Sequence, residues 1–359
     1  MTTPDLPPVL APDLAPDLPA EPGPDGVEPT AEELRKRKRR KILLLLLLLL
    51  AAAVVVATLL FLATGQEAPG VPGIGGPANL PSYSFSMYGV ARPLGVAVST
   101  NGDRVYVTES DGPRLVHVYD RDGKEVGALE PPNATTAGHV PVYVAVDPLT
   151  DDIYVSDRIA QTVYVYDASG RYKREFKPPR ATLGGGWQPL GLAFDAEGNL
   201  YATDVSGPSN RVLSFTRAGK LLHRYGAAGQ FSFPNGIAID RWGNVYVADS
   251  NNGRVVVFDK AGKPLTGVSS GSSAERLGLP RGEAIDTSNR LYVVDTTDQS
   301  VQVFGLHDEG TTPPTFVGSF GQLGRAEGAF AYPNGIATDG GDRIYVTDRE
   351  NNRVQVWNR

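Results

Sequence analysis

The chain has 359 residues, no cysteine and a formal net charge of −6, which excludes a disulfide framework, a thiolate metal site and a cysteine nucleophile. Its 41 glycines and 29 prolines are typical of many short strands joined by turns. The residues from Ile42 onward are mildly acidic, which argues against a nucleic acid as the main partner.

Residues 1–41 are low in complexity and change charge abruptly. Residues 1–30 repeat Pro-Asp-Leu in an acidic, proline-rich background, which predicts a disordered tail because too little apolar surface is available for burial. A wholly basic run follows and is expected to lie beside a membrane: Arg35, Lys36, Arg37, Lys38, Arg39, Arg40 and Lys41. The leucine-bearing motifs are either docking sites for a cytoplasmic partner or part of a passive, solvated tail.

Residues 42–63 (ILLLLLLLLAAAVVVATLLFLA) are apolar except for Thr58. As a helix, this stretch is about 30 Å long, enough to cross a bilayer. The alternative is a cleaved signal peptide, whose apolar core has roughly 7–15 residues. The length favours an uncleaved anchor. Basic residues before the span are retained in the cytoplasm. We therefore predict a single-pass cell-membrane protein with a cytoplasmic N-terminus and, after a Gly/Pro linker at 64–81, an extracytoplasmic body.

Residues 82–359 contain six copies of one unit, aligned on a proline: Pro93, Pro141, Pro189, Pro234, Pro280 and Pro333. The proline begins a strand of small residues, and a turn, two further strands and a less regular fourth strand follow. Four short strands in a unit of about 40–50 residues predict an all-β, six-bladed propeller. The sixth unit ends after its third strand. We expect SYSFSMYG (82–89) to supply the fourth and so close the ring.

The repeated pattern P-x-G-I-A-x-D, Y-V-x-D, N-x-R-V-x-V-F resembles the NHL-repeat family over residues 82–359, most clearly in the fourth and sixth units. The second unit departs from it, with Tyr143 at the glycine position and Thr162 at the arginine position. The resemblance implies a six-bladed propeller. The family uses this fold in extracytoplasmic sensor domains of bacterial membrane proteins, in RNA- or protein-binding modules and, in related forms, in lyases or lactonases with a central metal.

Acids that recur in the units are expected to be structural. The aspartate that ends the first strand, such as Asp240, precedes a turn and accepts hydrogen bonds from its backbone. The acid that ends the second strand is often followed by an arginine that opens the third, as in Asp249 and Arg254. This spacing predicts an ion pair across the hairpin loop.

The fifth unit departs from the others within LPRGEAID (279–286). Glu283 replaces an apolar residue, and Arg281, two residues earlier, is expected to point to the same side of the innermost strand. Asp295 and Asp298 belong to the same unit. One hypothesis is an ion pair of Glu283 with Arg281 or with a base of a neighbouring blade. The other is a ligand site, or a site for a divalent cation, at the central channel.

Three further candidates lie near the entries to blades. His139 is expected near the channel mouth, and the four histidines of the chain do not supply a three-histidine zinc centre by their strand positions. Trp187 and Tyr143, with Phe233 and Tyr332, form either an aromatic rim for a ligand or packing between blades.

The sequence therefore favours a binding or scaffold module that takes a protein, a peptide or a cell-envelope ligand on one face. The alternative is a metal-dependent hydrolase or lyase that uses acids near Glu283 and Asp295. No cofactor is implied, and the ligand is not identified by these patterns.

Overall fold

The computed structural model describes residues 80–132, 138–207, 210–268, 277–307 and 310–359. The predicted tail (1–41), the apolar span (42–63) with its basic flank and nearly all of the linker (64–81) lie outside these residues. Within the described ranges, no helix has the length and apolarity needed to cross a membrane.

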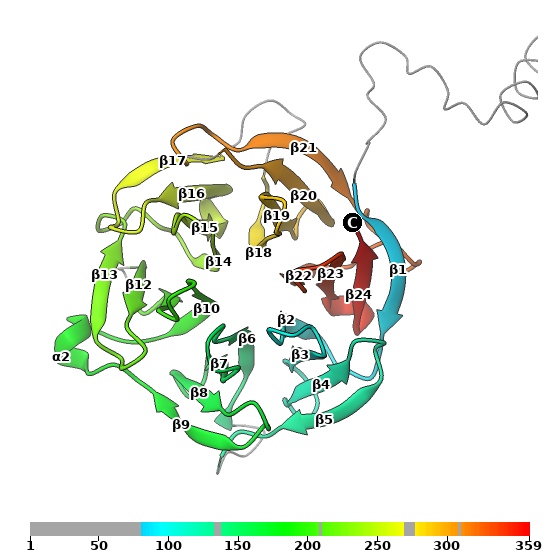
Figure 1. Ribbon diagram of the computed structural model, residues 1–359, viewed down its shortest axis with the longest axis horizontal. Helices are drawn as coiled ribbons and strands as arrows, with labels where there is room; N and C mark the ends of the chain where they lie inside the picture. The colour runs from blue at the N-terminus through cyan, green and yellow to red at the C-terminus, as the bar shows by residue number, and fades with distance from the viewer. Residues whose placement is uncertain (1–79, 133–137, 208–209, 269–276, 308–309) are drawn as a thin grey trace, which may run out of the picture. The chain divides into compact units, whose positions relative to one another are not determined.

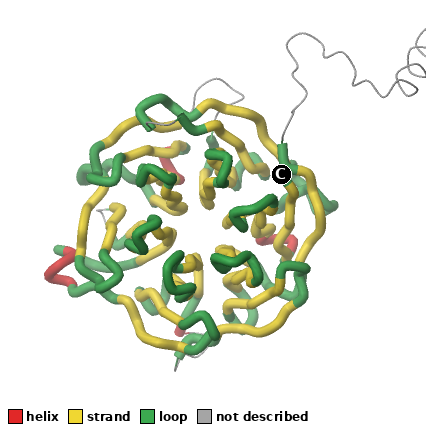
Figure 2. The backbone as a smooth tube through the Cα atoms, in the orientation of Figure 1, coloured by secondary structure: helices red, strands yellow, loops and turns green. Residues whose placement is uncertain are grey.

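Six four-stranded antiparallel sheets are arranged as blades around a central axis, as predicted (Figure 1). Figure 2 shows that the described chain of the ring is almost entirely strand and loop. In each blade the innermost strand is the one that begins at the repeated proline. The strands of blades 1 to 3 are β2 (Pro93–Val98), β3 (Arg104–Glu109), β4 (Val116–Asp120), β5 (Glu125–Leu129); β6 (Pro141–Val146), β7 (Ile153–Asp157), β8 (Thr162–Tyr166), β9 (Tyr172–Phe176); and β10 (Pro189–Phe194), β11 (Leu200–Asp204), β12 (Arg211–Phe215), β13 (Leu221–Tyr225).

Blades 4 and 5 repeat this order, and blade 6 completes it with the first strand of the ring. Their strands are β14 (Pro234–Ile239), β15 (Val245–Asp249), β16 (Arg254–Phe258), β17 (Pro264–Val268); β18 (Pro280–Ile285), β19 (Arg290–Asp295), β20 (Ser300–Gly305), β21 (Thr315–Phe320); and β22 (Pro333–Thr338), β23 (Arg343–Asp348), β24 (Arg353–Asn358). Short helices connect a few of them: α2 (Arg180–Leu183), η2 (Ser250–Asn252) and η3 (Arg349–Asn351).

The ring is closed by strand β1 (Ser82–Met87), which pairs antiparallel with β24. Tyr83 lies opposite Trp357, and Met87 lies opposite Val354. Blade 6 is therefore built from both ends of the propeller sequence, as the pattern of residues 82–89 predicts. The pairing covers the edge of β24 that would otherwise have open hydrogen-bonding groups.

A hydroxyl group joins each blade to the next. Thr203 of β11, for example, accepts a hydrogen bond from the backbone N–H of Gly191 and donates one to the carbonyl of Asn235 in blade 4 (2.8 and 2.9 Å). The corresponding bonds go completely around the ring: Thr108 to Val142, Ser156 to Leu190, Ser250 to Pro280, Thr296 to Pro333 and Thr347 to Leu94. The innermost strands are thereby held at a fixed distance from the axis.

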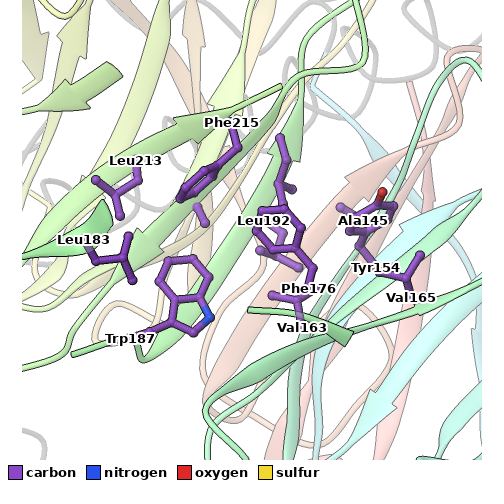
Figure 3. Packing of buried hydrophobic residues seen from close by; sticks show 12 residues of the cluster. Ala145, Tyr154, Val163, Val165, Phe176, Leu183, Trp187, Leu192, Leu213 and Phe215 are labelled. Carbon is purple, nitrogen blue, oxygen red and sulfur yellow. The ribbon is translucent and has the colours of Figure 1, made fainter. Parts of the chain in front are cut away.

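Apolar side chains fill the spaces between blades. Figure 3 shows the cluster between blades 2 and 3, which includes Tyr154 and Val165 of blade 2 and Leu192 and Phe215 of blade 3. Trp187 belongs to this cluster, with its ring edge-on to Phe215 at 5.9 Å between centroids. Trp187 is therefore placed as a packing residue, one of the two roles that its position predicts.

The recurrent acids have the structural roles expected of them. Asp240 accepts hydrogen bonds from the backbone N–H groups of Trp242 and Asn244 (2.9 and 2.8 Å). The predicted ion pairs across the hairpin loop form in three blades: Asp204 with Arg211 at 2.8 Å, Asp249 with Arg254 at 2.8 Å and Asp348 with Arg353 at 2.7 Å. These carboxylates are engaged in hydrogen bonds and ion pairs within the protein and are not available to a ligand.

Candidate functional site

A cavity of about 770 Å³ opens at the end of the ring where the innermost strands begin. Every blade contributes the residue that follows its repeated proline: Leu94, Val142, Leu190, Asn235, Arg281 and Asn334. The cavity is thus the mouth of the central channel. Its volume is within the range of about 300–1,000 Å³ that is usual for small-molecule sites.

The wall of the cavity comes from two other positions of the repeat. The residue before the proline contributes Arg92, Val140, Phe233, Leu279 and Tyr332, and the residue after the second-strand acid contributes Ser110, Arg158, Thr296 and Arg349. Arg92, Phe233 and Tyr332 have φ values of 49°, 58° and 54°. This left-handed region is unfavourable for bulky residues, and such strain is concentrated at functional sites.

The lining is strongly basic. It contains one acidic side chain, Asp111, and the following arginines: Arg92, Arg114, Arg158, Arg281 and Arg349. Glu350, beside the cavity, pairs with Arg92 at 2.6 Å and with Arg349 at 3.3 Å. Burial first, and then the charge of Arg92, lower the pKa of Arg349. The cationic groups are therefore close enough to repel one another.

Arg281 has no carboxylate partner among the described residues. Its guanidinium lies 5.8 Å from the centre of the Phe233 ring. Its Nε is buried and makes no hydrogen bond within the described part of the chain. The positive charge of Arg281 is therefore presented to the cavity without a counter-ion from the fold.

Glu283 does not form the ion pair that was one of the two hypotheses. Neither of its carboxyl oxygens has a hydrogen-bonding partner in the described structure, and the side chain is only 7% exposed. Between Pro280 and Glu283, two residues of β18 lie opposite one residue of β19, a bulge that interrupts the expected alternation. Arg281 lines the cavity, whereas Glu283 does not. Burial raises the pKa of Glu283 well above its ordinary value, so the neutral acid is favoured.

Tyr143 crosses the channel. Its hydroxyl, on blade 2, donates a 2.6 Å hydrogen bond to Oδ1 of Asn235 on blade 4. The five other blades have glycine at this position, where the innermost strands approach closely: a Cβ on Gly236 would lie 2.1 Å from the carbonyl oxygen of Arg281. Burial raises the pKa of Tyr143, so this hydroxyl acts as a hydrogen-bond donor. Tyr143 thus links blades 2 and 4 next to the cavity.

Three other sequence candidates are next to lining residues in the chain but do not themselves line the cavity. Asp295 accepts hydrogen bonds from the backbone N–H groups of Gly278 and Leu279 (2.6 and 3.1 Å), and the backbone N–H of Asp298 contacts the same carboxylate at 3.3 Å. His139 is 3% exposed, and its Nε2 lies 2.8 Å from the carbonyl oxygen of Arg114. Across the described ranges, no three or more His, Asp or Glu side chains are grouped so that they could hold a metal ion.

The sequence argument therefore identified Arg281 and missed the other arginines of the lining. Arg92 precedes a repeated proline, and Arg158 and Arg349 each follow a second-strand acid. Comparing these two positions across the six units would have revealed them, because the other units have neutral residues there. Arg114 lies five residues after Glu109, the spacing of Arg254 after Asp249, so the sequence argument assigned it to the recurrent pair across the hairpin loop and not to the cavity.

Comparisons with known proteins agree with this architecture. The NHL repeat family matches residues 231–258 and 330–357, in blades 4 and 6. NHL repeat-containing protein 3 of Homo sapiens is 32% identical over 77 residues, which are 20% of this chain and 22% of the human protein. The similarity to this relative therefore covers about a fifth of its length.

Several solved structures share the fold at low sequence identity. A protein of unknown function from Bacteroides thetaiotaomicron has a TM-score of 0.57 at 17% identity, over 78% of this chain and 72% of that one. A streptogramin B lyase has a TM-score of 0.52 at 15% identity, over 76% and 96%. A catalytically inactive virginiamycin B lyase from Staphylococcus aureus, with quinupristin, has 0.53 at 15%, over 77% and 98%. At these identities the likeness concerns the fold alone. The NHL-repeat matches in blades 4 and 6 and the six closed blades together support the resemblance of this chain to NHL-repeat β-propellers.

Proposed function

We propose that this protein is a membrane-anchored binding module whose propeller lies outside the cytoplasm and takes its ligand in the cavity at the channel mouth. The observation that carries the proposal is the cavity itself. Four of its five arginines, all except Arg114, stand at positions where most units of the repeat have neutral residues, and Arg281 has no carboxylate partner among the described residues. Residues that a fold does not need, gathered in a concave site, are the usual mark of a binding site.

The composition of the cavity favours binding over metal-dependent chemistry. Five arginines against one aspartate repel a divalent cation. The acids that the sequence suggested for catalysis are not in the cavity lining. Asp295 accepts hydrogen bonds from backbone N–H groups, and Glu283 is buried outside the lining. A cation site or an acid catalyst in this cavity has no support from the described side chains.

The membrane anchor is supported by the sequence of residues 35–63, in which a basic run precedes an apolar stretch long enough to span a bilayer. The absence of cysteine provides a direct test. Ala261→Cys, in an exposed turn of the propeller, should react with a membrane-impermeant maleimide in intact cells. Thr3→Cys should react only after lysis. Labelling of Thr3→Cys in intact cells, or of Ala261→Cys only after lysis, would contradict the orientation.

Binding at the cavity is tested with a variant that fills it. Leu279 is partly exposed and lines the cavity, so Leu279→Trp adds bulk there with little change to the core. We expect Leu279→Trp to abolish capture of the natural ligand from a membrane extract. Trp242→Ala, in the turn at the other end of β14, should capture it as the parent does. Equal capture by Leu279→Trp and the parent, at equal melting temperature, would exclude the cavity as the site.

A further inference from the structure

We infer that the cavity recognises a small amphipathic anion, an apolar body that carries one carboxylate or phosphate group, with Arg281 as the residue that holds the charged group. The inference rests on the proposal that the cavity is the binding site, and it names the chemical class of the ligand. Guanidinium groups suit such groups because they donate parallel hydrogen bonds to two oxygens.

The charged part of the site is an arc over three adjacent blades. Arg281 on blade 5, Arg349 on blade 6 and Arg92 on blade 1 all line the cavity. Their mutual repulsion is expressed at Arg349, whose pKa is lowered by burial and then by Arg92 and Arg281, against the effect of Glu350. Glu350 is shared between Arg92 and Arg349 and does not pair with Arg281. An anion at Arg281 would relieve this repulsion.

The apolar part of the site lies mainly on blades 2 to 4, which also carry Arg158, and blade 1 adds Leu94. Val140, Val142 and Leu190 form a hydrophobic cluster with Tyr143, against which Leu94 and Phe233 pack. All but Tyr143 also line the cavity. A ligand that placed its charge on the arginine arc would therefore bury an uncharged body against this cluster, which contributes roughly 25 cal/mol per Å² of apolar surface removed from water.

Other polar groups of the lining are already satisfied by the protein. The side-chain amide of Gln299 donates to the carbonyl of Thr296 and accepts from the backbone N–H of Tyr332, both at 2.6 Å. Asn334 donates to the carbonyl of Leu94 at 3.0 Å. Asn235 accepts from Tyr143. The arginine arc differs from these groups, because the Nε atoms of Arg92, Arg281 and Arg349 are all buried without a hydrogen bond in the described structure. Of the three, Arg281 is the one without a carboxylate partner among the described residues, so it is where the ligand must supply an acceptor.

No neighbouring acid of the described residues forms an ion pair with Arg281, so its positive charge can interact with a ligand. Glu283 is the nearest acid along the strand, but it makes no ion pair with described residues, and burial favours its neutral form. Tyr143 does not line the cavity and bonds to Asn235, which does. The positive charge of Arg281 is therefore not paired with any acid of the described residues, whereas Arg92 and Arg349 share Glu350.

The test uses the full chain in maltoside micelles and calorimetric titration, with empty micelles subtracted. The probes are 1-naphthoate and 1-naphthyl phosphate, with uncharged 1-naphthamide, acetate and inorganic phosphate as comparisons. We expect one of the two naphthyl anions to bind at least about 10-fold more tightly than the amide and than the small anions, and the stronger of the two identifies the charged group. Loss of a charge-assisted hydrogen bond predicts that Arg281→Met weakens this binding by about 10-fold or more.

The matched control is Arg241→Met. Arg241 lies in the turn at the other end of β14, stacked on Trp242 at 4.4 Å, so its loss should leave the affinity unchanged. Arg349→Met serves as a second variant if Arg281→Met lowers the melting temperature. Equal affinity for naphthoate, naphthyl phosphate and naphthamide, or unchanged affinity in both arginine variants, would overturn the inference. If Leu279→Trp still abolishes capture of the natural ligand, only the anion class is wrong, and the proposed function stands.

Discussion

At the third position after the repeated proline, blade 5 has a glutamate where the other blades have valine, leucine or isoleucine. The equivalent Ile237 and Ile336 pack in hydrophobic clusters between adjacent blades. Glu283 therefore occupies an apolar position, and it has no hydrogen bond or ion pair with the described residues. A buried charge there would be costly, and the acid avoids that cost by keeping its proton.

The pH dependence of stability follows from this residue. The folded state raises the pKa of Glu283 above its ordinary value of 4.5, so the folded state binds this proton more tightly than the unfolded state. The free energy of unfolding should fall as pH rises from about 4.5 through the raised pKa, by up to about 1.4 kcal/mol per pH unit. Glu283→Leu should remove this component and be more stable than the parent at pH 8. Urea midpoints of both chains at pH 5 and pH 8 measure it, and an unchanged pH slope would refute the assignment.

At the scale of the strand, the hydrogen bonds from Thr and Ser hydroxyls to the next blade link the innermost strands around the ring. In four blades the hydroxyl immediately precedes the second-strand acid, as Thr203 precedes Asp204. In blades 4 and 5 that position is Ala248 or Val294, and the hydroxyl comes from the residue after the acid. The acceptor shifts as well: it is the carbonyl of the residue after the next blade's proline in the four blades, and the carbonyl of the proline itself in the other two. Both arrangements give a donor to a carbonyl of the next innermost strand, because a buried carbonyl without a donor is unfavourable.

Thr203→Val tests the importance of this link. The substitution keeps the shape of the side chain but removes the acceptor for Gly191 and the donor to Asn235, both of which are buried. The unfolding free energy should fall by about 1–3 kcal/mol. Thr266→Val, on the outermost strand β17, should change it by no more than about 0.5 kcal/mol. Denaturant unfolding compares the two variants, and equal losses would deny the hydroxyl a specific role.

At the scale of the whole propeller, stability depends on closure, because β1 is the only described strand that joins the beginning of the ring sequence to its end. Tyr83 stands edge-on to Trp357, with ring centroids 5.9 Å apart, and packs against the apolar cluster of blades 5 and 6. Without β1, the hydrogen-bonding edge of β24 would be open to solvent or to another chain.

Removal of β1 should therefore destabilise the ring and leave β24 with an unpaired edge that can pair with another chain. A chain that begins at residue 90 is expected to melt at a lower temperature and to form dimers or larger aggregates. A chain that begins at residue 80 retains β1 and is the comparison. Calorimetry and light scattering distinguish them. The same melting temperature and the same monomeric state in both chains would mean that closure contributes nothing.

The periodic features were predictable from the sequence. The spacing of Pro93 to Pro333 predicts six blades, the pattern of residues 82–89 predicts the closing strand, and Asp249 with Arg254 predicts the ion pair across a hairpin loop. Each of these depends on neighbours in the chain or on the repetition of one unit. The structure confirms all three. The tail and the membrane span remain predictions, since they lie outside the described residues.

The channel mouth was decided by tertiary structure. Arg92, Arg281 and Arg349 come from three blades, and only ring closure brings the first of them beside the other two. The bulge in β18 separates Glu283 from Arg281 although they are two residues apart. Tyr143, which the sequence marks only as a departure from glycine, crosses to Asn235 of another blade. The repeat determines how the strands pair within each blade. The lining of the channel mouth depends on side chains that are far apart in the sequence and meet only when the ring closes.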